Sequence, residues 1–163
     1  MAGARPRITI RAATDADLEP LVRLLGLLFS IEADFRPDPP RQRRGLLLML
    51  EEPERRVVLV AERAGAVIGM VTLQLVVSTA EGAPSAWIED MVVEERERGG
   101  GVGRALLEAA GRWAHGRGAT RLQLLADRAN RPALRFYRRL GWCETQLVCL
   151  RRGGKPGRAA PSR

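Results

Sequence analysis

Residues 96–110 read RERGGGVGRALLEAA, so Gly99, Gly100, Gly101 and Gly103 stand immediately before a run of helix-forming residues. Glycine loses more backbone freedom on folding than any other residue, but it adopts backbone angles that other residues avoid and lets another group approach closely. The run therefore predicts a tight strand-to-helix turn with outward-facing N–H groups, where the positive end of the helix attracts phosphate. Taken alone, the run is also compatible with a loose linker.

Two other phosphate-binding motifs do not fit this run. The dinucleotide fingerprint G-x-G-x-x-G requires a third glycine at position 106 or 104, and these positions hold Leu106 and Arg104. The P-loop requires a lysine after its last glycine, and none follows here. Neither a dinucleotide-binding domain nor a P-loop nucleotide site is predicted.

The polarity pattern predicts an α/β chain built on one sheet. Residues 7–11 alternate and are rich in β-branched side chains, which is typical of a strand. Thr14 and Asp17 have the spacing of a capping box, and leucines at helical spacing then predict a helix to about residue 31. The remaining expected elements are a short helix at 46–52 after a proline-rich break, two strands within 55–78 around a turn at 64–65, a strand at 86–93, a helix at about 101–117, a strand at 119–127, a helix at 130–141 and a last strand at 144–152.

Length and charge predict one domain with a short tail. The chain has 163 residues, enough for a single core, and we expect one domain over residues 1–152 followed by a basic, disordered tail over 153–163. The formal net charge is +8, and the last 13 residues hold five basic and no acidic side chains, which leaves +3 for the other 150. Because the excess charge gathers in the tail, nucleic acid is not an expected partner.

Cysteine usage and hydropathy predict a cytoplasmic protein without a metal. Cys143 and Cys149, with the single His115, lack the spacing of a metal site. No apolar stretch approaches the ~20 residues of a membrane span, and the start has no signal-peptide pattern. A membrane partner is therefore not expected.

Two motifs together resemble those of the GNAT (Gcn5-related) N-acetyltransferase superfamily. The first, R/Q-x-x-G-x-G/A, is matched by Arg98, Gly101 and Gly103. The second, N-x-x-A-x-x-F/L-Y-x-x-x-G-F/W, is matched by Asn130, Ala133, Phe136, Tyr137, Gly141 and Trp142. The resemblance is strong over residues 86–150 and extends to the element order over 7–78. It implies a single mixed, mostly antiparallel, splayed sheet flanked by helices.

The resemblance also implies that acetyl-CoA is the cosubstrate and lies in the V-shaped opening of the sheet. The implied binding residues are the backbone of Met91, Val92 and Val93 for the pantetheine arm; Arg98, Gly99, Gly100, Gly101, Val102, Gly103 and Arg104 for the pyrophosphate; and Asn130, Phe136 and Tyr137 toward the far end.

The implied reaction moves an acetyl group from a thioester to a primary amine of a small molecule or peptide. Tyr137, the only tyrosine in the chain, matches the superfamily's general acid, although it could instead only pack on the cosubstrate. A catalytically silent acetyl-CoA sensor, a protein-interaction module and a protein-lysine or N-terminal acetyltransferase are the alternatives. A homodimer is also open.

Glu89 and Asp90 are the candidate bases. An amine with a pKa near 10.4 costs about 4–5 kcal/mol to deprotonate at neutral pH, and a nearby carboxylate can accept the proton. Neighbours on a strand point to opposite faces, so we expect only one of the two to face the opening. Glu89, which shares a face with Met91 and Val93 under this alternation, is the preferred choice. Structural ion pairs with nearby arginines are the alternative.

The strand sequence IEDMVV, residues 88–93, resembles the matching strand of glucosamine-6-phosphate N-acetyltransferases, and Asp127 has a counterpart there. The acceptor pocket is expected to involve the stretch FSIEADFRPDPPRQRRG, residues 29–45, which mixes acidic and basic side chains. Both a cationic amine and an anionic sugar phosphate could find partners in it.

Overall fold

The computed structural model describes residues 6–32 and 34–152. It divides into two compact units, residues 1–124 and 125–163. The expected basic tail at 153–163 lies outside the described residues, and the single domain over 1–152 stays a prediction. No helix in the described ranges is both long and apolar enough to cross a membrane.

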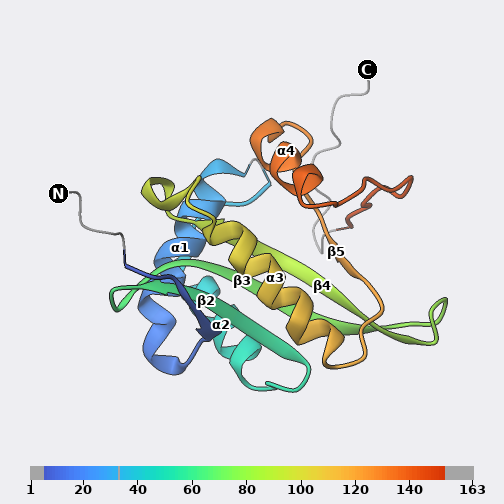
Figure 1. Cartoon of the computed structure of the whole chain (residues 1–163), viewed down its shortest axis with the longest axis horizontal. Coiled ribbons are helices and arrows are strands. Elements are labelled where there is room, and N and C mark those ends of the chain that lie inside the picture. Colours follow the sequence, from blue (N-terminus) through green and yellow to red (C-terminus); the bar gives the residue numbers. More distant parts are fainter. Residues whose placement is uncertain (1–5, 33, 153–163) are drawn as a thin grey trace. The chain divides into compact units, whose positions relative to one another are not determined.

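The first unit is built on one five-stranded sheet with the strand order β1-β2-β3-β4-β5 (Figure 1). Neighbouring strands run antiparallel except β4 and β5, which are parallel. The predicted mixed, mostly antiparallel sheet is therefore confirmed. The strands are β1 (Thr9–Ala12), β2 (Arg56–Arg63), β3 (Ala66–Ser78), β4 (Ala83–Val93) and β5 (Leu122–Leu124).

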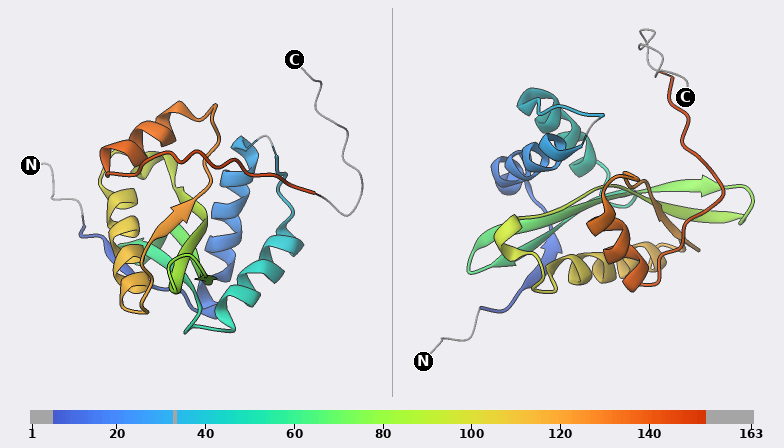
Figure 2. Two further views of the ribbon diagram at one scale, coloured as in Figure 1. Left: turned by 90° about the vertical axis from the view of Figure 1, so that its right-hand side faces the viewer. Right: turned by 90° about the horizontal axis from the view of Figure 1, so that it is seen from above.

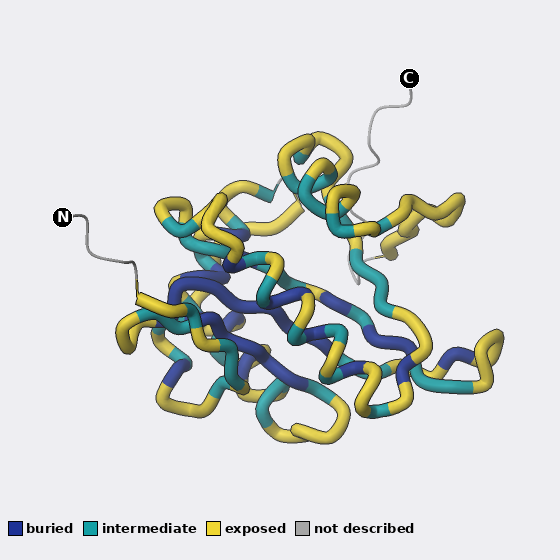
Figure 3. The backbone as a smooth tube through the Cα atoms, in the orientation of Figure 1, coloured by how far each residue is buried: buried dark blue, intermediate teal, exposed yellow. Residues whose placement is uncertain are grey.

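Helices cover both faces of this sheet. Figure 2 shows α1 (Leu18–Ile31) and α2 (Pro39–Leu50) on one face and α3 (Val102–His115) on the other. The central strands are buried between them (Figure 3). The main apolar cluster packs the inner face of α1 against side chains of β2, β3 and β4, as the leucine spacing predicted. Its buried members are Leu21, Leu24, Leu25, Leu28, Leu46, Val58, Val60, Val67, Met70 and Val92.

The second helix begins earlier than the expected residue 46. The Asp38 side chain accepts a hydrogen bond from the Arg41 backbone N–H at 3.1 Å, and Pro39 and Pro40 occupy the first helical positions. Proline is tolerated there because those N–H groups have no partner inside a helix. The prolines that seemed to interrupt the chain therefore begin α2.

The turn between β2 and β3 lies where the sequence placed it. Ala64 and Gly65 have φ angles of 51° and 78°. Positive φ at both central residues of a two-residue hairpin matches the right-handed twist of the flanking strands.

The second unit contains α4 (Arg131–Arg139), and the last expected strand is wrong. The described residues 144–152 contain no strand, and Leu147 and Leu150 are 86% and 90% exposed. Alternating polarity identifies a segment that suits a sheet, but a strand forms only where another edge pairs with its backbone.

A charged network ties the beginning of the chain to the sheet. Arg11 on β1 donates two hydrogen bonds to the Asp17 carboxylate, at 2.8 and 2.9 Å, and one to Glu62 on β2 at 2.8 Å. Asp17 also accepts from the Thr14 backbone N–H at 2.8 Å, which completes the predicted capping box. The Asp17 side chain is buried, and the hydrogen bonds from Arg11 are the largest cause that lowers its pKa to about 2.

We expect Asp17→Asn to lower the free energy of unfolding at pH 7 by about 2 kcal/mol, because the charged pair with Arg11 is lost. The folded-state pKa lies below the ordinary value of 3.8, so this stabilisation is present above about pH 4 and disappears as the pH falls toward 2. Urea unfolding of the wild type and of Asp17→Asn should therefore show that their free energies of unfolding become equal as the pH falls toward 2. Asp15→Asn, in the same turn but exposed, is the matched control and should change stability by less than about 0.5 kcal/mol. A difference in free energy of unfolding between the wild type and Asp17→Asn that persists to pH 2 would contradict the electrostatic explanation.

Candidate active site

The glycine run forms a turn at the beginning of α3. Gly99 and Gly101 have φ angles of 77° and 83°, and an added Cβ at either would meet nothing within 4 Å. Glycine is therefore required at these two positions by the backbone conformation and not by crowding. Gly100 and Gly103 have no positive φ, so this freedom explains two of the four glycines.

The first turn of α3 presents its N–H groups without a side-chain cap. Gly101 occupies the N-cap position, and glycine has no side chain to accept these hydrogen bonds. The first N–H groups of any helix lack carbonyl partners inside the helix and carry its partial positive charge. The buried Val102 side chain anchors this end of α3, while Arg104 is exposed. The tight strand-to-helix turn is thus present as the sequence predicted, and phosphate binding there stays a prediction.

Ion pairs hold the turn against the sheet. The short helix η2 (Glu95–Glu97) precedes the turn, and Glu97 pairs with Arg63 at the end of β2, their side chains 15% and 12% exposed. Glu94 pairs with Arg23 of α1 at 2.9 Å. Arg98 donates from Nε to the Val93 carbonyl at 3.1 Å, so part of its guanidinium already binds the end of β4.

One edge of β4 is open beside this turn. The parallel pairing of β4 with β5 ends at Ile88 and Leu124, whereas β4 continues to Val93. Within the described residues, Met91 to Val93 have a strand partner on the β3 side only. The Val92 side chain is buried in the α1 cluster. An extended pantetheine arm could bind this edge as an added strand does.

A β-bulge lies between this open edge and the paired part of β4. Glu89 and Asp90 together oppose the single residue Thr72 of β3. A bulge inserts one extra residue into a strand and changes the direction of the side chains after it. The pairs that define the register are Leu73 with Ile88 and Val71 with Met91.

The expected alternation of Glu89 and Asp90 is wrong because of the bulge. The Glu89 carboxylate accepts a hydrogen bond at 2.8 Å from the indole of Trp87, two residues back on the same face. The Asp90 carboxylate accepts one at 3.1 Å from Thr72 directly opposite. Both acidic side chains therefore lie on the α1 side of the sheet, and Glu89 does not share a face with Met91.

The environments of these two carboxyl groups differ. Asp90 is partly buried, and this desolvation raises its pKa to about 6, with further raising contributions from the charges of Glu89 and Glu32. The hydrogen bond from Thr72 acts in the opposite direction. Glu89 is exposed. The Asp90 carboxyl group can therefore gain and lose a proton near neutral pH.

In the second unit, the residues of the later motif build and end α4. The Asn130 side chain accepts a hydrogen bond from the Ala133 N–H at 3.1 Å and caps the helix. At the other end Gly141 has φ 86°, and the Trp142 N–H bonds to the Tyr137 carbonyl at 3.1 Å. This is a Schellman ending. An asparagine followed by a proline two residues later is typical of a helix start, so the sequence itself carries a signal for the capping role of Asn130.

Tyr137 lies in an aromatic cluster within this unit. Its ring centroid is 5.3 Å from that of Phe136 and 5.9 Å from that of Trp142. Tilted rings at such distances pack favourably and restrict the orientation of the phenol. Its role as a general acid and the binding roles of Phe136 and Asn130 stay predictions.

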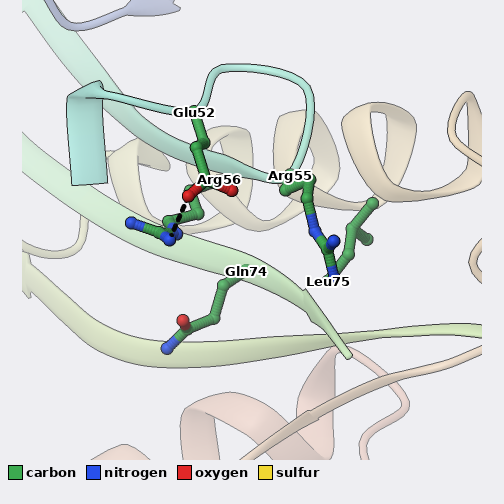
Figure 4. Close-up of a pocket in the computed structure, with 5 residues that line it drawn as sticks. All are labelled: Glu52, Arg55, Arg56, Gln74 and Leu75. Atoms are coloured by element: carbon green, nitrogen blue, oxygen red, sulfur yellow. Dashed lines mark hydrogen bonds and ion pairs between the residues drawn. The ribbon is translucent and has the colours of Figure 1, made fainter. Parts of the chain in front are cut away.

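A separate pocket lies near the beginning of β2. Figure 4 shows Arg56 beside Glu52, to which it donates at 2.6 Å, while a second nitrogen donates to the Leu48 carbonyl, also at 2.6 Å. None of the predicted site residues is among its lining residues, which are Glu52, Arg55, Arg56, Gln74 and Leu75. Since Arg56 is committed to structural bonds, we assign this pocket no function.

Comparison with known proteins agrees with this geometry. The profile of the family described as Acetyltransferase (GNAT) family matches residues 21–142. Aminoglycoside N(6')-acetyltransferase type 1 from Stenotrophomonas maltophilia is 31% identical over 144 residues, which cover 86% of this chain and 89% of that protein. Streptothricin acetyltransferase from Streptomyces lavendulae is 43% identical over 63 residues, 36% of this chain. The match spans only 33% of that relative.

Solved structures share the fold. Aminoglycoside N-acetyltransferase AAC(6')-Iy in complex with CoA superposes with a TM-score of 0.80 at 19% identity, over 95% of this chain and all of that chain. Glucosamine-6-phosphate N-acetyltransferase from Arabidopsis thaliana gives 0.72 at 19% identity, over 90% of this chain and 98% of that one. The resemblance to the latter enzymes is thus a distant structural one.

The mixed sheet, the open β4 edge and the uncapped glycine turn define the acyl-CoA N-acyltransferase class of fold. The chain belongs to the GNAT acetyltransferase family, which confirms the resemblance drawn from its two motifs.

If the turn binds a pyrophosphate, Gly101→Leu should weaken binding of CoA at least tenfold in calorimetry, because a side chain would stand where the phosphate approaches. The matched control is Gly118→Leu. Gly118 follows the other end of α3, has a φ of 79° and has equally open surroundings. Both variants carry similar backbone strain of about 1–3 kcal/mol, but only one alters the turn. Equal losses of affinity would show that strain alone is responsible, and unchanged affinity in Gly101→Leu would exclude the site.

Proposed function

We propose that this protein transfers the acetyl group of acetyl-CoA to a primary amine of a small, positively charged molecule of the aminoglycoside type. The observation that carries the proposal is the Asp90 carboxyl, partly buried at the bulge with a pKa of about 6, just beyond the last residue of β4 that pairs with β5. The relative that matches most of the chain is named as an aminoglycoside acetyltransferase, which supports this acceptor class.

The proposed step is a direct attack in a ternary complex. Acetyl-CoA supplies the acetyl group as a thioester, and the bond from amine nitrogen to carbonyl carbon forms while the carbon–sulfur bond breaks. Asp90, ionised above about pH 6, accepts the amine proton directly or through one water. Tyr137 gives its phenolic proton to the leaving sulfur. We assign the base to Asp90, because it is a partly buried carboxyl whose raised pKa suits a proton acceptor near neutral pH, whereas Glu89 is exposed.

The local charge favours a cationic acceptor. The charges of Glu89 and of Glu32, at the end of α1, both reach Asp90 strongly enough to raise its pKa. Two carboxylates within electrostatic range of Asp90 attract ammonium groups and repel a phosphorylated sugar. A cationic amine is therefore favoured over an anionic sugar phosphate, the two acceptor types compatible with the sequence of residues 29–45.

We expect Asp90→Asn to lower kcat/KM by about 10²–10⁴-fold at pH 7, the usual size of general base catalysis. The loss should shrink as the pH approaches the pKa of the amine, where little deprotonation remains to be assisted. Glu89→Gln removes a neighbouring carboxylate of the same charge and is the matched control, with an effect below about tenfold. The assay is acetyl transfer to an aminoglycoside such as kanamycin across pH 5–10.

A stability measurement separates this role from misfolding. Because burial raises the folded-state pKa of Asp90 above its ordinary value, its carboxylate destabilises the fold as the pH rises from about 4 through 6. Asp90→Asn should therefore unfold at a higher temperature than the wild type at pH 7. A pH-dependent loss of activity in Glu89→Gln instead would move the base to Glu89. Absence of transfer to every amine tested would favour the acetyl-CoA sensor.

For Tyr137, we expect Tyr137→Phe to lower kcat by about 10²–10⁴-fold while the Kd for acetyl-CoA stays within about threefold. The phenyl ring keeps the packing with Phe136 and Trp142 and removes only the hydroxyl. Steady-state kinetics and calorimetry measure the two quantities. A kcat close to that of the wild type would leave Tyr137 with a packing role.

A further inference from the structure

We propose that Thr72 is a positioning residue that holds Asp90 in the bulge and sets the acidity of its carboxyl group. The inference rests on the proposed role of Asp90 as the base. It concerns a residue of β3 that neither motif contains.

The Thr72 hydroxyl makes two hydrogen bonds to the same residue. It accepts from the Asp90 backbone N–H at 2.9 Å and donates to the Asp90 carboxylate Oδ2 at 3.1 Å. Thr72 is 2% exposed, and both bonds are partly buried. In the described part of the chain, no other hydrogen bond reaches the Asp90 carboxylate.

The bulge explains why a hydroxyl is needed at this position. Two residues of β4 oppose Thr72, so one backbone N–H loses the carbonyl partner that a regular ladder supplies. A buried N–H without an acceptor costs about 1–3 kcal/mol. Threonine is suited to a strand by its branched side chain, and its oxygen replaces the missing carbonyl. Its proton remains available for the carboxylate.

The carboxylates around Asp90 raise its pKa, as burial does, and the hydrogen bond from Thr72 opposes these effects. Glu89 adjoins Asp90 on β4, and Glu32 faces it from the end of α1. Across the sheet, the β3 residues Thr72 and Gln74 on this side are uncharged. Burial and both carboxylates raise the pKa of Asp90, while the bond from Thr72 lowers it. Without that bond, Asp90 would be protonated over more of the neutral range and could not accept a proton there.

The test compares Thr72→Val, which keeps the shape and removes the hydroxyl, with Thr72→Ser, which keeps the hydroxyl. The Asp90 carboxyl carbon is titrated by NMR in the free protein, and kcat/KM is measured from pH 5 to 9. In Thr72→Val the titration and the acid limb of kcat/KM should both move to higher pH. Activity should then be about tenfold lower than wild type at pH 5.5 and within about threefold at pH 8.5. Thr72→Ser should resemble the wild type in both measurements.

An unchanged Asp90 titration in Thr72→Val overturns the inference, and so does an equal loss of activity at every pH, because either result makes Thr72 a structural brace only. If Thr72→Val does not fold, Thr72→Ala removes the same hydroxyl and is judged by the same criteria. The titration needs neither acetyl-CoA nor an amine. A failure of the proposed acetyl transfer would therefore appear in the Asp90→Asn assay and would not change the interpretation of the Asp90 titration.

Discussion

The unequal lengths of β4 and β5 shape the candidate site in the first unit. Their parallel pairing includes only three residue pairs and ends at Ile88 and Leu124. Beyond this point β4 remains paired with β3, while β5 no longer runs beside its other edge. Unpaired strand edges bind extended chains readily. The bulge follows immediately at Glu89 and Asp90, so the open edge and the shifted carboxyl groups arise in the same stretch of β4.

The glycine turn depends on a second set of interactions. Uncapped N–H groups attract an anion only if the turn is held in place, and the turn-forming glycines provide no side chains to hold it. Neighbouring charged pairs do this instead: Arg63 with Glu97 fixes η2 to the end of β2, and Arg23 with Glu94 fixes it to α1. The basic side chains here stabilise the position of the turn, and its backbone N–H groups are the ones predicted to bind phosphate.

Local patterns predicted most of the first unit from the sequence. The capping box at Thr14, the hairpin at Ala64–Gly65 and the leucine face of α1 each involve residues close in the chain, whose preferences need no distant partner. The start of α2 was also encoded locally, by Asp38 before two prolines, but the prolines were interpreted as a break. The bulge was not predictable in this way. It is a mismatch between β3 and β4, and alternation along β4 alone assigns Glu89 to the wrong face. The strand expected at 144–152 failed for a related reason, because pairing depends on a partner edge that the segment's own sequence does not reveal.

Two aspartates show how the same physics separates a structural carboxyl from a candidate catalytic one. Asp17 and Asp90 both leave bulk water, and in both cases desolvation raises the pKa. Arg11 more than offsets it for Asp17, whose pKa falls to about 2 and whose charge stabilises the fold at neutral pH. For Asp90, one hydrogen bond from a neutral hydroxyl opposes the effects of burial and of two carboxylates. Its pKa is therefore about 6, and its negative charge lowers the stability of the fold at neutral pH. A carboxyl group that lowers stability at neutral pH, with a threonine limiting that cost, has the properties expected of the proton acceptor that we propose for Asp90.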